Sequence, residues 1–342
     1  MRKEVRVGNI TLGDGKIYVQ SMLKKPANDI AGSIKQALEL QQAGCDIIRA
    51  AVPKKEDARL IYALKEKLKI PVVADIHFDY KIALAAISAG ADKIRLNPGN
   101  LEADKRKQVA LECQKRAVPI RIGINAGSLE EDIKQKYGVC AEALVESALR
   151  SVQLLEEIGF EDIILSVKAS SVKMTIEAYR LLYKRCTYPL HVGVTEAGPK
   201  RLGIMKSAVG IGALLCDGIG DTIRVSLTDE PIEEIKAARD LLTAAGLGNC
   251  ADIISCPTCG RTGVDLKSLV NEADKLFADV KKPIKIALMG CAVNGLGEAR
   301  EADVGIACGD GSGVLFRKGE KVCNVCEEDM LKALAEEVKK LL

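Results

Sequence analysis

Short apolar runs alternate with longer amphipathic stretches through the first three quarters of the chain. In the longer stretches apolar residues recur every three or four positions, as at Leu60, Leu64 and Leu68, which is typical of helices that pack on a sheet. The runs between them have the length and composition of β-strands. Eight strands are predicted, at residues 17–21, 47–51, 72–75, 93–96, 120–124, 162–166, 190–194 and 222–225.

Eight β/α units in roughly 230 residues predict an α/β fold with a (β/α)8 TIM barrel. Two short apolar segments, 5–7 and 10–12, precede the first unit and predict a β-hairpin that plugs the bottom of the barrel. We expect its turn at Gly13-Asp14-Gly15. A doubly wound open sheet is the alternative, because alternation alone does not show that the sheet closes.

The pattern changes after Gly246-Leu247-Gly248-Asn249 to that of a smaller α+β unit. A cysteine-bearing loop is followed by a predicted helix at 266–277, a strand at 284–289, a Gly-rich loop, short strands near Val304 and Val314, and a final helix. We therefore predict two domains, a substrate-binding barrel at 1–250 and a C-terminal α+β domain at 251–342.

Composition narrows the class of function. The 342 residues include 50 Lys and Arg against 47 Asp and Glu, and aromatic residues make up only 3%, so nucleic-acid binding is not expected. No apolar run is long enough to span a membrane, and the N-terminus lacks the apolar stretch of a signal peptide, so we expect a cytoplasmic protein. In a reducing compartment, twelve cysteines indicate metal or redox chemistry more readily than disulfides.

Charged and polar residues gather at the carboxyl ends of the predicted strands, where a TIM barrel carries its active site. Four Arg and one Lys face two carboxylates there, which leaves a surplus of three positive charges. Because an unpaired buried guanidinium is costly and its planar fork suits phosphate oxygens, the pattern predicts a substrate with more than one phosphate. These residues are Arg49, Asp75, His77, Arg95, Asn97, Arg121, Asn125, Lys168, Glu196, Arg224 and Ser226.

Three side chains in this set are candidates for the chemistry itself. Glu196 and His77 could each act as a general acid or base, although His77 could equally be a hydrogen-bonded core histidine. Lys168 could instead form a Schiff base, which would make the protein a barrel aldolase with a structural zinc module. The aldolase hypothesis is the alternative to phosphate binding.

Six of the twelve cysteines lie in residues 256–342. Pairing the Cys256-Pro-Thr-Cys259 motif with Cys323 and Cys326 would make a four-thiolate zinc ribbon. Pairing it with Cys291 would make three thiolates, which leaves one iron of a [4Fe–4S] cluster without a cysteine. Glu298, after a Gly-rich turn, is the candidate for that fourth position. Six further cysteines predict small buried side chains: Cys45, Cys113, Cys140, Cys186, Cys216 and Cys250.

Seven motifs together carry a family resemblance over essentially the whole chain. They are Val19-Gln-Ser-Met22, Ala74-Asp-Ile-His-Phe78, Arg95-Leu-Asn-Pro-Gly-Asn100, Arg121-Ile-Gly-Ile-Asn-Ala-Gly-Ser128, His191-Val-Gly-Val-Thr-Glu-Ala-Gly198, Ser255-Cys-Pro-Thr-Cys-Gly-Arg-Thr262 and Met289-Gly-Cys291 through Glu298. With these motifs the chain resembles the bacterial two-domain 4-hydroxy-3-methylbut-2-enyl diphosphate synthases of the non-mevalonate isoprenoid pathway.

The resemblance implies reductive ring opening of 2-C-methyl-D-erythritol 2,4-cyclodiphosphate with electrons from reduced ferredoxin or flavodoxin. It implies a [4Fe–4S] cluster held by Cys256, Cys259 and Cys291, with Glu298 as its displaceable fourth ligand. The strand-end residues, with Asn294 of the Gly-rich loop, would bind the diphosphate, and Glu196 would donate a proton. It also implies a head-to-tail homodimer in which the cluster domain of one subunit closes the barrel of the other.

The sequence departs from the family pattern at three places. Leu296 stands where the family usually has Pro, which removes a restraint from the ligand loop. The segment Leu23-Lys-Lys-Pro26 replaces a Thr- and Asn-containing loop, so no site residue is carried over from it. Cys308, Cys323 and Cys326 are additional to the family core, and we expect them to be thiols on the solvent side.

Overall fold

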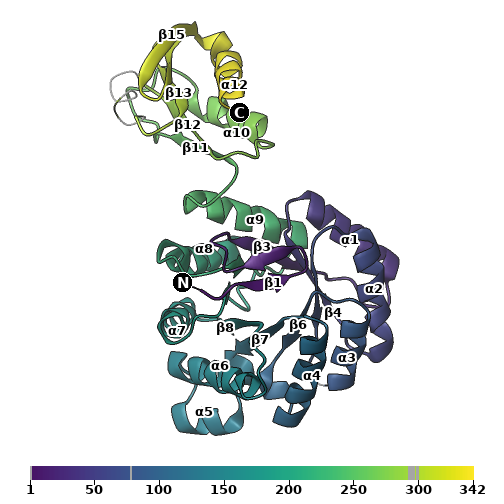
Figure 1. The fold of residues 1–342 in the computed structure, drawn as a ribbon. Helices are drawn as coiled ribbons and strands as arrows, with labels where there is room; N and C mark the ends of the chain where they lie inside the picture. Colours follow the sequence, from purple (N-terminus) through teal and green to yellow (C-terminus); the bar gives the residue numbers. More distant parts are fainter. Residues whose placement is uncertain (1, 78, 292–296, 298–299) are drawn as a thin grey trace. The chain divides into compact units, whose positions relative to one another are not determined.

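The computed structural model describes residues 2–77, 79–291, 297 and 300–342, and the structural statements that follow concern those residues. They form two compact units, Met1–Leu241 and Leu242–Leu342 (Figure 1). The division falls inside helix α9 (Pro231–Ala244). The domain boundary between residues 250 and 251 stays a prediction.

The first unit is a parallel eight-stranded barrel, as predicted. Its sheet runs in the order β8-β7-β6-β5-β4-β3-β10-β9, and a parallel bridge between Leu165 and Leu190 links the two ends of that order. This nearly closed ring of sequential neighbours is a TIM barrel and excludes the doubly wound sheet. The strands are β3 (Tyr18–Met22), β4 (Ile47–Ala51), β5 (Val72–Asp75), β6 (Lys93–Leu96), β7 (Ile120–Asn125), β8 (Ile163–Lys168), β9 (His191–Val192) and β10 (Thr222–Ile223).

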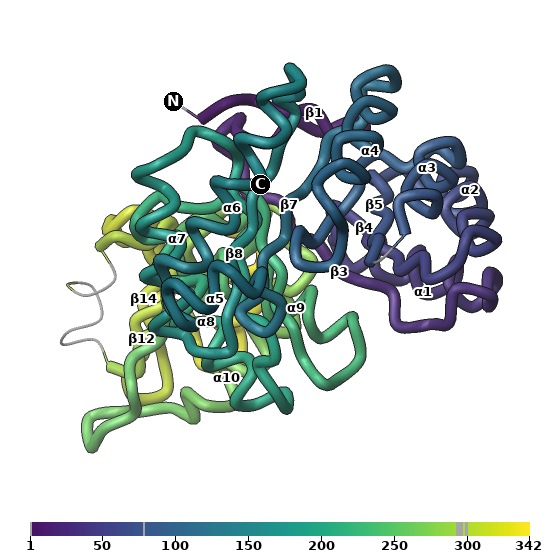
Figure 2. Tube along the Cα trace, turned by 90° about the horizontal axis from the view of Figure 1, so that it is seen from below, coloured from purple at the N-terminus to yellow at the C-terminus, as the bar shows by residue number. Residues whose placement is uncertain are grey.

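Helices surround these strands, and both views show α2, α3 and α4 outside β4 (Figures 1 and 2). Local capping sets several starts: the Asp29, Asp79 and Ser171 side chains accept backbone N–H groups at the beginning of α1, α3 and α7. The helices are α1 (Ile30–Gln42), α2 (Ala58–Lys67), α3 (Tyr80–Ser88), α4 (Ala103–Lys115), α5 (Glu131–Tyr137), α6 (Ala141–Glu156), α7 (Val172–Arg185), α8 (Lys200–Cys216) and α9, with short 3-10 turns η1 (Lys55–Asp57), η2 (Pro98–Asn100) and η3 (Ala126–Ser128).

The N-terminal hairpin packs at the amino-terminal end of the barrel, with β1 (Val5–Val7) antiparallel to β2 (Ile10–Leu12). Val5, Val7 and Leu12 form one buried cluster with Ile164 of β8, which confirms the predicted plug. The predicted position of the turn is wrong. Because Val7 pairs with Ile10, the turn is Gly8-Asn9, and Gly8 adopts the left-handed φ of 59° that such two-residue turns require.

The second unit has a five-stranded mixed sheet in the order β11-β12-β13-β14-β15. Helices α10 and α12 contribute Leu266, Phe277, Met330 and Leu334 to a buried cluster on one face of that sheet. The elements are β11 (Ala251–Ser255), α10 (Leu266–Phe277), β12 (Ile284–Met289), β13 (Val304–Cys308), β14 (Ser312–Arg317), β15 (Glu320–Cys326), η4 (Glu327–Asp329) and α12 (Met330–Leu341). In the described part of the chain, no helix combines the length and apolar character needed to cross a membrane.

Two strands of this domain were not predicted from the sequence. β11 precedes the Cys256 loop, and β15 carries Cys323 and Cys326 at the edge of the sheet. Both strands lie at edges and are partly or largely exposed, so they lack the continuous apolar runs of the central strands.

Candidate active site in the barrel and cysteine loops

Six basic side chains point into the barrel from five strands, since Lys93 and Arg95 share β6. Neighbouring strands place Asp75 beside Arg95 and Arg95 beside Arg121, on the same face of the parallel sheet. Two buried carboxylates lie among these six basic side chains. The basic residues are Arg49, Lys93, Arg95, Arg121, Lys168 and Arg224, and the carboxylates are Asp75 and Glu234.

Asp75, at the end of β5, holds two of the guanidinium groups. Its carboxylate accepts hydrogen bonds from Arg49 at 2.6 Å and from Arg95 at 3.2 Å, and His77 Nε2 lies 3.8 Å away. Burial alone would raise the pKa of Asp75, but the Arg49 and Arg95 charges lower it to about 2. Asp75 is therefore an ionised carboxylate that orients two arginines at the carboxyl end of the barrel.

Two glycines make room for the cations. A Cβ on Gly123 would meet Arg95 Nε at 3.0 Å, and a Cβ on Gly193 would meet Lys168 Nζ at 2.6 Å. The Gly123 carbonyl also accepts a hydrogen bond from Arg95 at 3.4 Å. The motifs Arg121-Ile-Gly123 and His191-Val-Gly193 thus combine an inward-facing Arg or His side chain with the space that a neighbouring basic side chain occupies.

Sequence reasoning missed Lys93 and His191, which lie deeper in the barrel. His191 Nε2 is 3.2 Å from Lys168 Nζ, and its Nδ1 is 2.7 Å from Thr222 Oγ1. Burial and then the Lys168 charge hold the pKa of His191 well below its usual value, so the ring is neutral. Lys93 lies two residues before Arg95 on the same strand face. Side chains two residues apart on a strand point to the same side of the sheet. Counting back in steps of two from the residues at the strand ends would have found both Lys93 and His191.

Sequence reasoning also missed Glu234, the second buried carboxylate, because it lies on α9. It accepts from Arg224 at 3.3 Å and from the Leu227 backbone N–H at 3.1 Å. Lys24 lies 3.6 Å from the same carboxylate and donates to the Leu227 and Asp229 carbonyls. The segment at residues 23–26, to which the family resemblance assigned no site residue, therefore supplies a cation at the rim of the barrel.

The remaining predicted barrel residues lie around the rim. Asn97 joins two loops, because its amide donates to Ser128 Oγ at 2.8 Å and its carbonyl accepts from the Gly99 N–H. Asn125 and Ser226 are partly exposed. Glu196 is exposed in the loop after β9 with a left-handed φ of 53°, a conformation that costs a residue with a Cβ about 1–2 kcal/mol. Strain of this kind is characteristic of functional loops.

In the second unit, two contacting loops carry three of the cysteines. The Gly290 N–H donates to Cys256 Sγ at 3.2 Å, and the Gly263 N–H donates to the Gly290 carbonyl. The backbone N–H and side chain of Arg261 lower the pKa of the exposed Cys259 thiol, which favours the thiolate that binds metals. Cys291 follows Gly290 directly and is partly exposed.

Among the described residues, no three His, Cys, Asp or Glu side chains are close enough to hold one metal ion. The three thiols nevertheless suit an iron–sulfur cluster in chemistry, since a backbone N–H already points at one sulfur and the loops are joined at Gly290. Glu298, Asn294 and Leu296 lie outside the described residues. Their roles stay predictions.

The zinc-ribbon pairing does not fit the sheet. Cys256 follows β11 and Cys323 lies on β15, at opposite edges of a five-stranded sheet, on the order of 15–20 Å apart. Cys308 is buried against Met330, and burial raises the pKa of its thiol to about 11, so the expectation that it lies on the solvent side is wrong. Cys323 and Cys326 are exposed, as predicted.

The other six cysteines divide by exposure. Cys45 and Cys113 are buried, as predicted for packing residues, whereas Cys216 is exposed, so that prediction is wrong for Cys216. Cys216 is the last residue of α8 and lies on its outer side, where the core does not reach.

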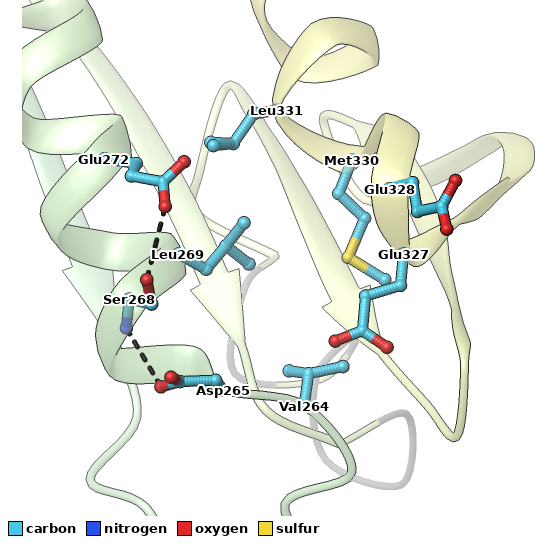
Figure 3. Close-up of a pocket in the computed structure, with 9 residues that line it drawn as sticks. All are labelled: Val264, Asp265, Ser268, Leu269, Glu272, Glu327, Glu328, Met330 and Leu331. Atoms are coloured by element: carbon cyan, nitrogen blue, oxygen red, sulfur yellow. Dashed lines mark hydrogen bonds between the residues drawn. The ribbon is translucent and has the colours of Figure 1, made fainter.

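A groove of about 320 Å³ between α10 and the η4–α12 segment is a poor candidate for the site (Figure 3). Four carboxylates line it, from Asp265, Glu272, Glu327 and Glu328, and Ser268 hydrogen-bonds to two of them. This negative lining would repel a diphosphate, and no cysteine is among its lining residues. The barrel interior in the first unit and the cysteine loops in the second remain the candidate functional regions.

Comparisons with known proteins cover nearly the whole chain. The GcpE TIM-barrel domain matches residues 2–239, and the GcpE protein C-terminal domain matches residues 252–340. A protein of Caldanaerobacter subterraneus is 50% identical over 100% of this chain and 98% of its own length, and one of Geobacillus thermodenitrificans is 51% identical over 99% and 92%. Both are named 4-hydroxy-3-methylbut-2-en-1-yl diphosphate synthase (flavodoxin).

Solved structures that resemble the chain show its fold alone. Dihydropteroate synthase from Stenotrophomonas maltophilia aligns with a TM-score of 0.53 at 15% identity, over 70% of this chain and 96% of its own. The Yersinia pestis dihydropteroate synthase gives 0.53 at 14%, over 72% and 100%. The resemblance drawn from the motifs is confirmed by the domain matches and the full-length relatives: the chain belongs to the GcpE family of 4-hydroxy-3-methylbut-2-en-1-yl diphosphate synthases.

Proposed function

We propose that the protein converts 2-C-methyl-D-erythritol 2,4-cyclodiphosphate to 4-hydroxy-3-methylbut-2-en-1-yl diphosphate. The reaction takes up two electrons, breaks the carbon–oxygen bond to one phosphate and releases one hydroxyl as water. One observation supports this function above the others: four arginines and two lysines share the barrel interior with only two carboxylates. A buried surplus of positive charge is stable only when an anion fills the site.

The cations suit a diphosphate in geometry as well as charge. Buried nitrogen atoms on Arg49, Lys93, Arg95 and Arg121 have no hydrogen-bond partner within the described part of the chain. Each is a donor that a phosphate oxygen can satisfy. Because Asp75 fixes Arg49 and Arg95 before the ligand arrives, little side-chain entropy is lost on binding. Asn97, Asn125, Ser226 and Asn294 complete the proposed substrate contacts.

Proton transfer is assigned to the rim. Glu196 lies in the loop that follows β9 and is open to solvent, so it can give a proton to the departing hydroxyl and regain one from water. His77, beside Asp75, is the second candidate. Ring opening itself adds one ionisable hydroxyl on phosphate, and the arginines around Asp75 stabilise the charge that develops there.

The cofactor in this proposal is a [4Fe–4S] cluster held by Cys256, Cys259 and Cys291. Glu298 would be its fourth ligand. When bound, such a cluster supplies single electrons and an iron with an exchangeable ligand position. This chain's own contribution is to hold Cys259 as a thiolate through Arg261 and to direct the Gly290 N–H at Cys256. Thiolate ligands need a reducing compartment, which agrees with the expected cytoplasmic location.

Flavodoxin is the proposed electron donor, because the relatives are named as flavodoxin enzymes, with ferredoxin as the alternative.

We also propose that the protein forms a head-to-tail homodimer. An exposed apolar row along α8 supports self-association: Leu202, Met205 and Val209 are 47%, 58% and 60% exposed and lie on one helical face. Met205→Glu should then yield monomers in light scattering, and an unchanged molar mass would exclude this surface.

The test is turnover without oxygen. Protein with iron and sulfide near four each should convert the cyclic diphosphate to the linear product when reduced flavodoxin is added, followed by mass spectrometry. Glu196→Gln should lower kcat at least tenfold and leave binding intact, whereas Glu177→Gln on the exposed face of α7 should change neither. Cluster-loaded protein that binds substrate without converting it, or borohydride trapping at Lys168 with activity in air, would refute the proposal.

A further inference from the structure

The two lysines inside the barrel differ from its four arginines in one chemical respect. Arginine keeps its proton under all conditions that a protein experiences, whereas lysine loses its proton when burial and neighbouring cations make the charged form unfavourable. Lys93 and Lys168 are both buried, at 0% and 8% exposure. His191 is already neutral. The empty barrel can therefore reduce its surplus charge only by losing protons from these two lysines.

The surroundings of Lys93 favour the neutral amine. Its Nζ has no hydrogen-bond partner among the described residues. Burial, followed by the charges of Arg121 and Arg49, holds the pKa of Lys93 well below its usual value, and only Asp92 acts in the other direction.

Lys168 is in a similar position. Its Nζ contacts His191 Nε2 at 3.2 Å, and this ring is itself neutral. Burial comes first among the causes that hold the pKa of Lys168 well below its usual value, followed by the charges of Arg121, Arg224, Arg49 and Arg95. The two carboxylates of the barrel are already engaged, Asp75 by Arg49 and Arg95 and Glu234 by Arg224.

A diphosphate changes this balance. We propose that the barrel binds its cyclic diphosphate together with protons, which Lys93 and Lys168 take up as the anion enters. Both lysines thereby become substrate-binding cations only in the filled site. The inference rests on the proposed binding of the cyclic diphosphate in the barrel, and it adds Lys93 to the residues that bind it.

The substrate itself contributes no protons to this exchange. Each phosphorus of a cyclic diphosphate carries one strongly acidic hydroxyl, so the ligand stays a dianion from weakly acidic to weakly basic solution. Any net uptake on binding therefore belongs to the protein. Uptake of about one to two protons would raise the net charge of these groups from +2, for four arginines against two carboxylates, to +3 or +4, because the negative charge of the bound ligand favours protonated lysines.

The experiment is calorimetry of cluster-loaded protein with the cyclic diphosphate, without reductant, at about pH 8 in buffers of different ionisation enthalpy. The slope of binding enthalpy against buffer enthalpy gives the proton count. Lys93→Met should lower the count by up to one, and Lys168→Arg, which keeps its charge but does not titrate, should lower it while binding persists. Lys67→Met is the control, because this exposed lysine ends α2 away from the mouth.

The outcomes separate the two claims. Uptake of one or more protons that falls in the lysine variants, but not in Lys67→Met, supports the inference. Binding heat with a proton count near zero, or a count that neither lysine variant lowers, overturns it while leaving diphosphate binding intact. The absence of any binding heat contradicts the proposed function and this inference together.

Discussion

Replacing Asp75 by Asn removes a buried charge while keeping the shape of the side chain. The carboxylate pairs with Arg49 at 2.6 Å and with Arg95 at 3.2 Å, and only 1% of its side chain is exposed. The pKa of Asp75 falls from 3.8 to about 2 in the folded protein. At 1.36 kcal/mol per pKa unit, ionised Asp75 contributes about 2.5 kcal/mol to folding at neutral pH.

The pH dependence of this contribution follows from its sign. Because the folded pKa lies below the unfolded one, the stabilisation is fully present above about pH 4 and is lost as pH falls toward 2. Asp75→Asn should therefore lower the Tm of the ligand-free protein by about 5–10 °C at pH 7, and the difference should shrink below about pH 4.

The assay is thermal unfolding followed by circular dichroism, with Asp132→Asn as the matched control. Asp132 pairs with Arg150 at the same 2.6 Å, but both side chains are about half exposed, so its loss should lower the Tm far less. Equal Tm losses in the two variants at pH 7 would refute this reasoning.

Three further predictions address other parts of the site. Gly193→Ala should weaken diphosphate binding at least tenfold in calorimetry, because its methyl group would meet the neighbouring ammonium at 2.6 Å; Gly212→Ala, with open space around it in α8, should be neutral or slightly stabilising. Cys291→Ser should abolish the visible absorbance of anaerobically prepared protein, whereas Cys323→Ser should keep full iron content; equal iron in both would contradict the assignment. Lys93→Met should raise the ligand-free Tm at pH 7, and the gain should shrink as pH approaches 10, since the unfolded chain binds the extra proton of lysine below that pH.

The barrel was predictable from sequence because its strands are buried on both faces. Such strands are nearly continuous apolar runs, and predicted strands at 47–51, 72–75 and 93–96 agree with the observed β4, β5 and β6. The edge strands β11 and β15 lack that signal. The hairpin turn was misplaced because Gly8-Asn9 and Gly13-Asp14-Gly15 carry the same turn chemistry, and only the pairing of Val7 with Ile10 decides between them.

Site residues at the strand ends were predictable because the topology fixes where those ends meet. Lys93 and His191 were missed since they lie one layer deeper, where the usual expectation is an apolar side chain. Glu234 could not be found from strand positions, because a helix that follows the last strand brings it to Arg224. Tertiary packing determines such partners, and a single sequence does not reveal it.

The central claim is that the buried cations of the barrel bind the diphosphate. Its most direct test is calorimetric titration of cluster-loaded protein with the cyclic diphosphate, comparing Arg121→Met with Arg150→Met. Arg121 is 2% exposed among the other cations, so its loss should weaken binding about 100-fold or more, whereas loss of the exposed Arg150 should change affinity less than twofold. Equal affinities in the two variants would contradict the account.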